Sequence, residues 1–162
     1  MPPSPTITHT PSTSGETLHL GPVTIRIIED GSHTNNRIGA VMLSIAPHTP
    51  GPALHWHRMH DETFLITRGR FVFTTDKTTQ TASTHDYIVV PPGALHTFAN
   101  PFPEPAEFYN SFTPAYYVDY LRLLASETGK AGGELSEERA EEVMAQFATF
   151  VHEAEVEGGM DG

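Results

Sequence analysis

His55 and His57, separated by one residue, are the side chains of this sequence that most clearly suggest chemistry. In an extended strand, side chains at i and i+2 leave the same face, with their backbone positions about 6.6 Å apart. Two imidazoles in this arrangement can both reach one metal ion at about 2.0–2.1 Å. Glu62 follows after a short turn that can return its carboxylate toward the same point. This stretch therefore predicts one wall of a metal site.

A third histidine, His96, follows the turn-forming segment 91–93, which reads Pro-Pro-Gly. We expect His96 to face inward with the first two histidines. Three histidines and one glutamate suit a divalent transition metal and leave coordination positions open. Asn100, close behind His96, either orients a ligand or closes a turn.

The elements that must position these residues are short apolar segments, separated by Gly, Pro and polar turns. Their β-branched residues and partial alternation are typical of half-buried strands. Strands that follow one another without intervening helices favour an antiparallel sandwich or barrel over a parallel sheet. We expect strands at 23–29, 40–46, 53–57, 63–69, 70–76, 86–93, 95–100 and 107–113, with a polar hairpin or loop at 76–84.

The pattern changes after Pro114, where aromatic and Leu residues at helical spacing predict a helix over 115–129 that ends at Gly129. A second, amphipathic helix should start after its N-cap, Ser136, and pack on the outside of the barrel or on a partner subunit. Its apolar face would carry Val143, Met144, Phe147, Phe150, Val151 and Ala154. The chain is therefore expected to comprise a flexible leader at 1–17, a β-barrel at 18–114 and a helical extension at 115–162.

Composition excludes several classes of protein. The chain has 20 Asp and Glu against 9 Lys and Arg, a formal net charge of −11, so it lacks the basic patch that nucleic-acid binding needs. No apolar run approaches the roughly 20 residues that cross a bilayer, and the N-terminus lacks the pattern of a signal peptide. The absence of cysteine excludes disulfides and thiolate metal sites. We expect a cytoplasmic protein with neither nucleic acid nor membrane as a partner.

The stretch around the first two histidines resembles the first motif of the cupin family. That motif is His-x-His, three or four residues, Glu, six residues and Gly, and His55, His57, Glu62 and Gly69 meet every spacing. The glycine that begins the family motif is replaced here by Thr49. This departure affects a turn position and leaves the expected metal ligands intact.

The second cupin motif is Pro-x-Gly, two residues, His, three residues and Asn. Pro91, Gly93, His96 and Asn100 meet all of these spacings. The glycine that begins this motif is replaced by His85, again at a turn position. Because both motifs match together, the resemblance is specific, and it covers residues 51–100.

This resemblance implies an all-β fold, the double-stranded β-helix or jelly-roll cupin barrel, followed by C-terminal α-helices. It also implies one divalent transition metal per chain, with Fe, Ni or Mn favoured and Zn as a further candidate. The implied ligands are His55, His57, Glu62 and His96, and Glu62 is also the candidate catalytic base.

For two further groups of residues, the sequence gives a less specific indication of their role. His60 and Asp61 lie between the ligand strands, where a solvated turn is the simpler interpretation and hydrogen bonding to a ligand the second. By alternation, several phenylalanines either line a substrate pocket at the barrel mouth or simply fill the barrel, and the two interpretations carry equal weight. They are Phe64, Phe71, Phe73, Phe98, Phe108 and Phe112, with Leu65 as an alternative to Phe64.

Three functions compete. Likeness to single-domain quercetinase-like dioxygenases, in the first motif, in the segment 91–100 and in the aromatic segment 113–125, implies O2-dependent oxidation of an aromatic, polyphenolic or enolic small molecule. The same ligand set would serve a non-redox isomerase, decarboxylase or lyase of a secondary metabolite. A small-molecule-binding cupin without catalysis is the third. A homodimer, formed through a sheet edge and the C-terminal helices, is expected in each case.

Overall fold

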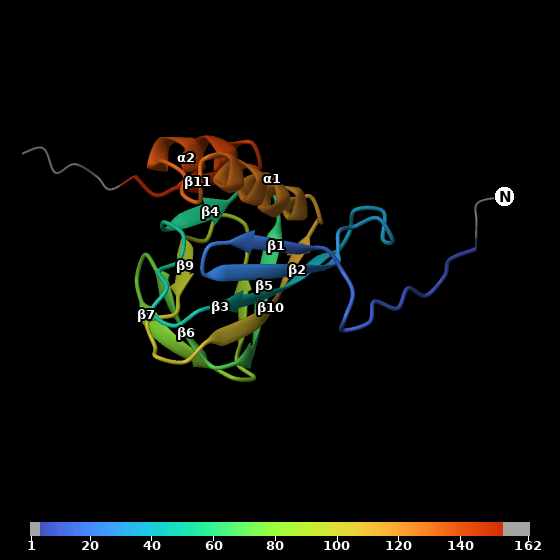
Figure 1. Cartoon of the computed structure of the whole chain (residues 1–162), viewed down its shortest axis with the longest axis horizontal. Coiled ribbons are helices and arrows are strands. Elements are labelled where there is room, and N and C mark those ends of the chain that lie inside the picture. The colour runs from blue at the N-terminus through green and yellow to red at the C-terminus, as the bar shows by residue number, and fades with distance from the viewer. Residues whose placement is uncertain (1–3, 154–162) are drawn as a thin grey trace, which may run out of the picture.

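The computed structural model describes residues 4–153, which form two antiparallel sheets and two helices (Figure 1). The helices are α1 (Tyr117–Lys130) and α2 (Glu137–Ala145). The strands are β1 (Thr17–Leu20), β2 (Val23–Glu29), β3 (Gly39–Ile45), β4 (His55–His57), β5 (Asp61–Arg68), β6 (Arg70–Thr75), β7 (Thr79–Ser83), β8 (Tyr87–Val90), β9 (His96–Ala99), β10 (Ala106–Thr113) and β11 (Thr149–Val151).

The two sheets have the strand orders β1-β2-β3-β10-β5-β8 and β11-β4-β9-β6-β7. Strand β10 comes late in the chain yet lies between β3 and β5, so the first sheet is assembled from segments far apart in sequence. Every pairing between strands is antiparallel, and the two sheets face one another as in a jelly roll. This arrangement confirms the predicted fold class, an all-β jelly roll followed by C-terminal helices.

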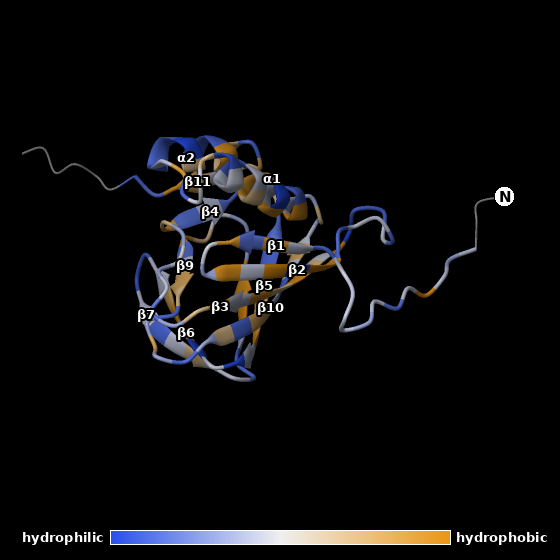
Figure 2. Ribbon diagram, in the orientation of Figure 1, coloured by the Kyte–Doolittle hydropathy of each residue, from blue (hydrophilic) through white to orange (hydrophobic). Residues whose placement is uncertain are grey.

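An aromatic cluster fills the space between the sheets. The rings of Phe64 and Phe71 lie 5.0 Å and 4.9 Å from that of Phe108, centroid to centroid, and Phe73 packs 5.1 Å from Phe64. All four side chains are buried. They come from alternate positions of β5, β6 and β10, which turn every second residue inward. Figure 2 shows that hydrophobic residues are also frequent along β2 of the first sheet.

The helices lie across one end of the barrel, beside β1 and β4 (Figure 1). Helix α1 passes through Gly129 and ends at Lys130, one residue later than expected. The predicted N-cap of α2 is confirmed, because the Ser136 hydroxyl accepts a hydrogen bond from the backbone N–H of Arg139 at 3.2 Å. No helix in the described part of the chain is long and apolar enough to cross a membrane.

The prediction that the second helix continues past residue 145 is wrong. Helix α2 ends at Ala145, and residues 149–151 instead form β11, which pairs with the ligand strand β4. Ala148 has a φ of 50°, a left-handed conformation that breaks the helical path. Thr149, Phe150 and Val151 are β-branched or aromatic, and the open edge of β4 offers them backbone hydrogen bonds. Ala154 lies outside the described residues, and the three-part division of the chain stays a prediction.

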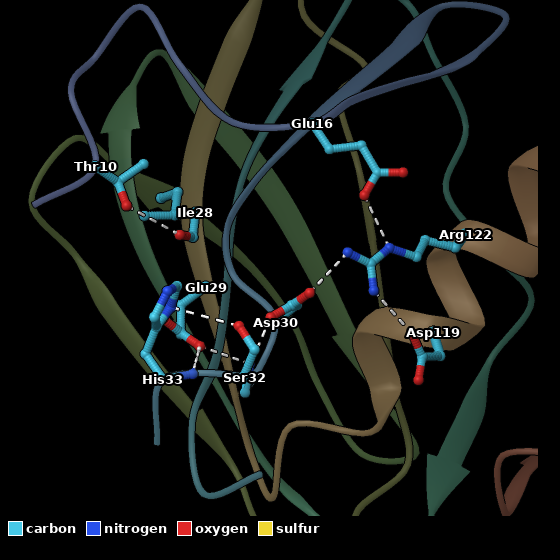
Figure 3. A network of polar contacts seen from close by, with 10 residues as sticks. Thr10, Glu16, Ile28, Glu29, Asp30, Ser32, His33, Asp119 and Arg122 are labelled. Carbon is cyan, nitrogen blue, oxygen red and sulfur yellow. Dashed lines mark hydrogen bonds and ion pairs between the residues drawn. The ribbon is translucent and has the colours of Figure 1, made fainter. Parts of the chain in front are cut away.

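Arg122 of α1 pairs with three acidic side chains, and two of them, Glu16 and Asp30, connect the helix to the N-terminal strands (Figure 3). Its guanidinium donates to Glu16 at 2.9 Å, to Asp30 at 2.9 Å and to Asp119 at 3.0 Å. Hydrogen bonds from Ser32 and from Arg122 hold the pKa of Asp30 well below its ordinary value of 3.8. The pair of Arg122 with Asp30 therefore contributes to stability only while Asp30 is ionised.

We expect the replacement Asp30→Asn to lower the free energy of unfolding at pH 7 by about 0.5–1 kcal/mol, since the pair is partly solvent-screened. A carboxylate with a depressed pKa stabilises the fold above its ordinary pKa, and this contribution is lost as the pH falls below about 4. Urea unfolding at pH 7 and pH 3 should thus show a smaller pH effect in the variant than in wild type. The more exposed Asp119→Asn is the control, and an equal pH effect in Asp30→Asn and wild type would contradict the assignment.

Candidate metal centre

The four predicted ligands lie together inside the barrel. β4 carries His55 and His57, β5 carries Glu62 and β9 carries His96. His55 and His96 are direct partners across the β4–β9 pairing, so the two motifs meet through the sheet. All four side chains are at most 4% exposed. The tertiary structure therefore brings both halves of the sequence pattern to one buried point.

Glu62 lies at the centre of this group. Its Oε2 atom is 3.0 Å from Nε2 of His57 and 3.0 Å from Nε2 of His96. A ring nitrogen from each of His55, His57 and His96 lies within 4.8 Å of the others. The three histidine nitrogens are thus close enough for one ion to contact them together, with Glu62 beside two of them.

Hydrogen bonds outside the group determine which ring nitrogens face inward. Nδ1 of His55 lies 2.7 Å from the carbonyl oxygen of Ala53, and Nδ1 of His96 lies 3.0 Å from that of Ala94. A carbonyl can only accept, so both Nδ1 atoms carry protons and Nε2 keeps its lone pair in the neutral ring. Once the protons that Nε2 of His57 and His96 share with Glu62 are released, imidazole lone pairs and a carboxylate converge on one point, a donor set that fits a divalent cation.

The charges at the centre are strongly coupled. Burial alone would raise the pKa of Glu62, but hydrogen bonds from His57 and His96 outweigh it and hold this pKa well below the ordinary value. Burial alone would lower the pKa of His96, but the hydrogen bond to Glu62 outweighs it and raises this pKa. Glu62 is therefore an anion at neutral pH, and it attracts a positive charge into the barrel.

The pKa of His55 is shifted in the opposite direction to that of His96. Burial, together with the neighbouring His96 and His57, lowers the pKa of His55 to about 3. Its ring is consequently neutral at physiological pH. A metal ion would not have to displace a proton from His55 in order to bind there.

The interpretation of His60 as part of a solvated turn is wrong. The side chain is only 1% exposed, and its ring lies 4.2 Å from that of His57 and 4.5 Å from that of Tyr117, centroid to centroid. Nδ1 of His60 is 3.1 Å from the Tyr116 hydroxyl, whereas Nε2 is buried with no partner. Burial lowers the pKa of His60 to about 3, so the ring is neutral. Sequence alone could not show this, because α1 supplies the covering tyrosines from a distant segment.

Asn110 belongs to the centre and was missed in the sequence. Its Nδ2 donates to Oε1 of Glu62 at 3.1 Å and to the carbonyl oxygen of Thr63 at 2.8 Å. The signal was present, since Asn110 stands between Phe108 and Phe112 at an inward position of a strand. A polar residue alternating with buried aromatic residues should have been read as facing the interior.

A cavity of about 230 Å³ opens onto this centre. His55 and Glu62 lie in its wall, next to the α1 residues Tyr117 and Tyr120. Most of the remaining wall is apolar and comes from the first sheet, from both helices and from the segment 50–52: Leu20, Val23, Ile25, Leu43, Ile45, Leu121, Leu124, Met144, Pro50, Gly51 and Pro52. The helices thus complete a cavity that the barrel leaves open.

The cavity divides the six candidate pocket phenylalanines into two groups. Phe98 and Phe112 line it. The assignment of the other four to the pocket is corrected, because they pack on one another in the core: Phe64, Phe71, Phe73 and Phe108. Alternation shows that a residue faces inward, but it does not show at which level of the barrel the interior is filled and at which level it is open.

Three further residues discussed above lie outside the metal centre, and two of them have structural roles. Nδ2 of Asn100 donates to the carbonyl oxygens of Ala46 and Glu104, so this residue closes a loop, one of its two predicted roles. Asp61 is exposed, as expected. Gly51 approaches the backbone so closely that a Cβ atom there would overlap the carbonyl oxygen of Phe98.

Comparison with known proteins agrees with this geometry. Residues 41–112 match the Cupin domain family. KdgF from Halomonas sp. is 16% identical, with a TM-score of 0.58 over 66% of this chain and 94% of its own. An RmlC-like cupin from Shewanella frigidimarina is 21% identical, with a TM-score of 0.57 over 67% and 93%. A sugar phosphate isomerase of the cupin superfamily from Silicibacter pomeroyi is 22% identical, with a TM-score of 0.52 over 58% and 60%.

No curated protein sequence matches the chain. The identities to the solved structures are low, so these structures show the shared fold and leave the reaction open. The matched family segment contains the four clustered side chains and most of both sheets. On this evidence residues 41–112 match the Cupin domain family, and the chain shares its fold with solved cupin structures.

Proposed function

We propose that the chain is a metal-dependent cupin enzyme that oxygenates a small aromatic or enolic molecule, with O2 as the oxidant. The observation that carries the proposal is the junction of the histidine and glutamate cluster with a largely apolar cavity. His55 and Glu62 belong to both features. A substrate held in this cavity would therefore lie against His55 and Glu62, two of the four proposed metal ligands His55, His57, Glu62 and His96.

The ion would supply redox or Lewis-acid chemistry, and Fe, Ni or Mn suits oxygenation better than Zn. Glu62 would act as the general base, because it is ionised at neutral pH and lies in the cavity wall. It can accept the proton of an enol or phenol O–H group and leave a more easily oxidised anion. Asn110 holds the other carboxylate oxygen and so keeps Glu62 oriented.

The wall of the cavity favours an uncharged, ring-containing substrate. Among the lining residues in the described part of the chain, none is Lys or Arg. A phosphorylated or carboxylated substrate would bring negative charge beside Glu62 without a cation from the wall. The hydroxyl-bearing rings of Tyr117 and Tyr120 can instead stack on an aromatic substrate. Burial raises the pKa of Tyr120 to about 12, so its hydroxyl stays protonated.

The alternative functions would use the same metal ligands and the same cavity. A non-redox isomerase, decarboxylase or lyase would use the ion as a Lewis acid and Glu62 to move a proton. One solved structure with the same fold is a sugar phosphate isomerase, but the absence of Lys and Arg from the described wall argues against a phosphosugar here. A cupin that binds its ligand without turnover would show the same cavity.

Homodimerisation stays a prediction. Strand β8 is an edge of the first sheet, and it exposes Tyr87 by 60% and Val89 by 58%. Leu65, on the neighbouring strand β5, is paired with Tyr87 and is 37% exposed. We propose this apolar edge as the place where a second copy would pack.

The test is oxygen uptake by tag-free protein loaded separately with Fe, Ni, Mn and Zn, against a panel of flavonols and simpler enols. We expect substrate-dependent O2 consumption with at least one redox-active metal. Leu124→Trp, which narrows the cavity from its wall, should lower kcat/KM by at least about tenfold and leave metal content unchanged. Turnover without O2, or with Zn alone, would contradict the oxygenase and support the isomerase or lyase. Tight ligand binding without turnover would leave a binding protein.

A further inference from the structure

The strand β11 lies beside the ligand strand β4, far from it in sequence and outside the segment that matches the Cupin domain family. Its register places Thr149 opposite His57 and Val151 opposite His55. Backbone hydrogen bonds flank the pairing, from Arg58 N–H to the carbonyl oxygen of Ala148 at 2.9 Å and from His152 N–H to that of Leu54 at 2.8 Å. The C-terminal segment thus covers the edge of the strand that carries two of the four proposed ligands.

Thr149 has a specific contact with one of those ligands. Its Oγ1 atom lies 2.8 Å from Nδ1 of His57, and the Thr149 hydroxyl donates to the carbonyl oxygen of Phe147 at 3.2 Å. When the hydroxyl proton is directed to Phe147, Oγ1 accepts from Nδ1 of His57, and Nε2 of the neutral ring is then free to bind an ion. Both side chains are buried, at 1% exposure for His57 and 0% for Thr149. Water therefore does not compete for this hydrogen bond.

Each of the three histidines has a hydrogen-bond partner at Nδ1, but these partners come from different parts of the chain. His55 and His96 donate from Nδ1 to backbone carbonyls within their own segments, at Ala53 and Ala94. Within residues 4–153, Nδ1 of His57 has no such local partner. It is instead hydrogen-bonded to Thr149, which lies 92 positions away in the sequence. The orientation of this one ligand hence depends on a strand that the barrel itself does not supply.

We propose that Thr149 is a positioning residue for the metal centre, which fixes the tautomer and ring orientation of His57 so that Nε2 faces the ion. The inference rests on the proposed metal-binding function and deepens it. A neutral imidazole whose Nδ1 proton is held by an acceptor is a stronger and better-oriented ligand through Nε2, and loss of such a partner typically costs about 10–100-fold in metal affinity.

The test is Co2+ titration of metal-free, tag-free protein, followed by calorimetry and by the visible absorption of bound Co2+. We expect Thr149→Val to weaken Co2+ binding by about 10–100-fold and to change the absorption bands. Thr149→Ser keeps the hydroxyl and should restore both within a few-fold. Thr49→Val is the matched control, because it removes the hydroxyl of another buried threonine, one that bonds the carbonyl oxygens of Ala46 and Pro47, and it should keep wild-type affinity.

Each outcome separates this inference from the proposed function. Wild-type affinity and absorption bands in Thr149→Val would overturn the role of Thr149 while leaving the metal site intact. Failure of wild type itself to bind Co2+ would overturn the metal-dependent function and this inference with it. If Thr149→Val does not fold, long-range 1H–15N spectra of Zn2+-loaded wild type decide the question. His57 should show a protonated Nδ1 and a coordinated Nε2, and coordination through Nδ1 would overturn the proposal.

Discussion

Replacing His57 with alanine should reduce the bound transition metal from one ion per chain to background. His57 is one of four side chains that converge at the centre, and its Nε2 lies 3.0 Å from Oε2 of Glu62. Loss of an outer partner of a ligand already costs about 10–100-fold in metal affinity, so loss of a ligand itself should cost more than about 100-fold. Elemental analysis of protein purified without added metal or a histidine tag measures the content, and Co2+ titration measures the affinity.

The variant His19→Ala is the matched control, because His19 is an exposed histidine on β1, away from the cluster. It should retain the full wild-type metal content. Equal metal in His57→Ala and wild type would show that the cluster is not where the ion binds. Absence of metal from both proteins, together with no Co2+ binding, would leave a ligand-binding barrel without metal chemistry.

The second large effect is expected on stability. Phe108→Ala should lower the free energy of unfolding by about 3–5 kcal/mol, because it removes a fully buried ring and leaves a cavity in its place. Phe108 is 0% exposed and lies within 5.2 Å, centroid to centroid, of the rings of Phe64, Phe71 and Phe98. Urea unfolding of the metal-free protein measures the loss.

This prediction also tests the division between core and cavity. Tyr87→Ala removes an aromatic side chain that is 60% exposed, and it should change the unfolding free energy by no more than about 0.5 kcal/mol. The Phe108→Ala protein that remains folded should bind Co2+ as wild type does, since Phe108 lines neither the metal centre nor the cavity. If Phe108→Ala had wild-type stability but impaired substrate binding, Phe108 would instead be a residue of the substrate pocket.

The sequence by itself indicated the four proposed metal ligands that meet at the centre. The spacing of His55 and His57 works on one strand, where the two-residue period sends both side chains to the same face. Glu62 and His96 were found by the matching motifs, and the structure places both beside His57. Local rules also predicted most of the strands and the N-cap of α2, because alternation and capping depend on residues near in sequence. They missed β1 and took the segment of β7 for part of a polar hairpin or loop.

Tertiary structure alone decided what surrounds the centre. The local sequence suggests that His60 is a turn residue, but Tyr116 and Tyr117, over fifty positions later in the chain, pack against its ring. Thr149 belongs to a segment with a helical pattern, yet it joins β4, because backbone hydrogen bonds to an open strand edge outweigh a weak helical preference. Alternation placed Phe108 and Phe112 on the same inward face, but only the packing of two sheets and a helix put one in the core and the other in the cavity wall. Side-chain direction is a local property of the backbone, whereas burial and contact depend on segments that the local sequence does not contain.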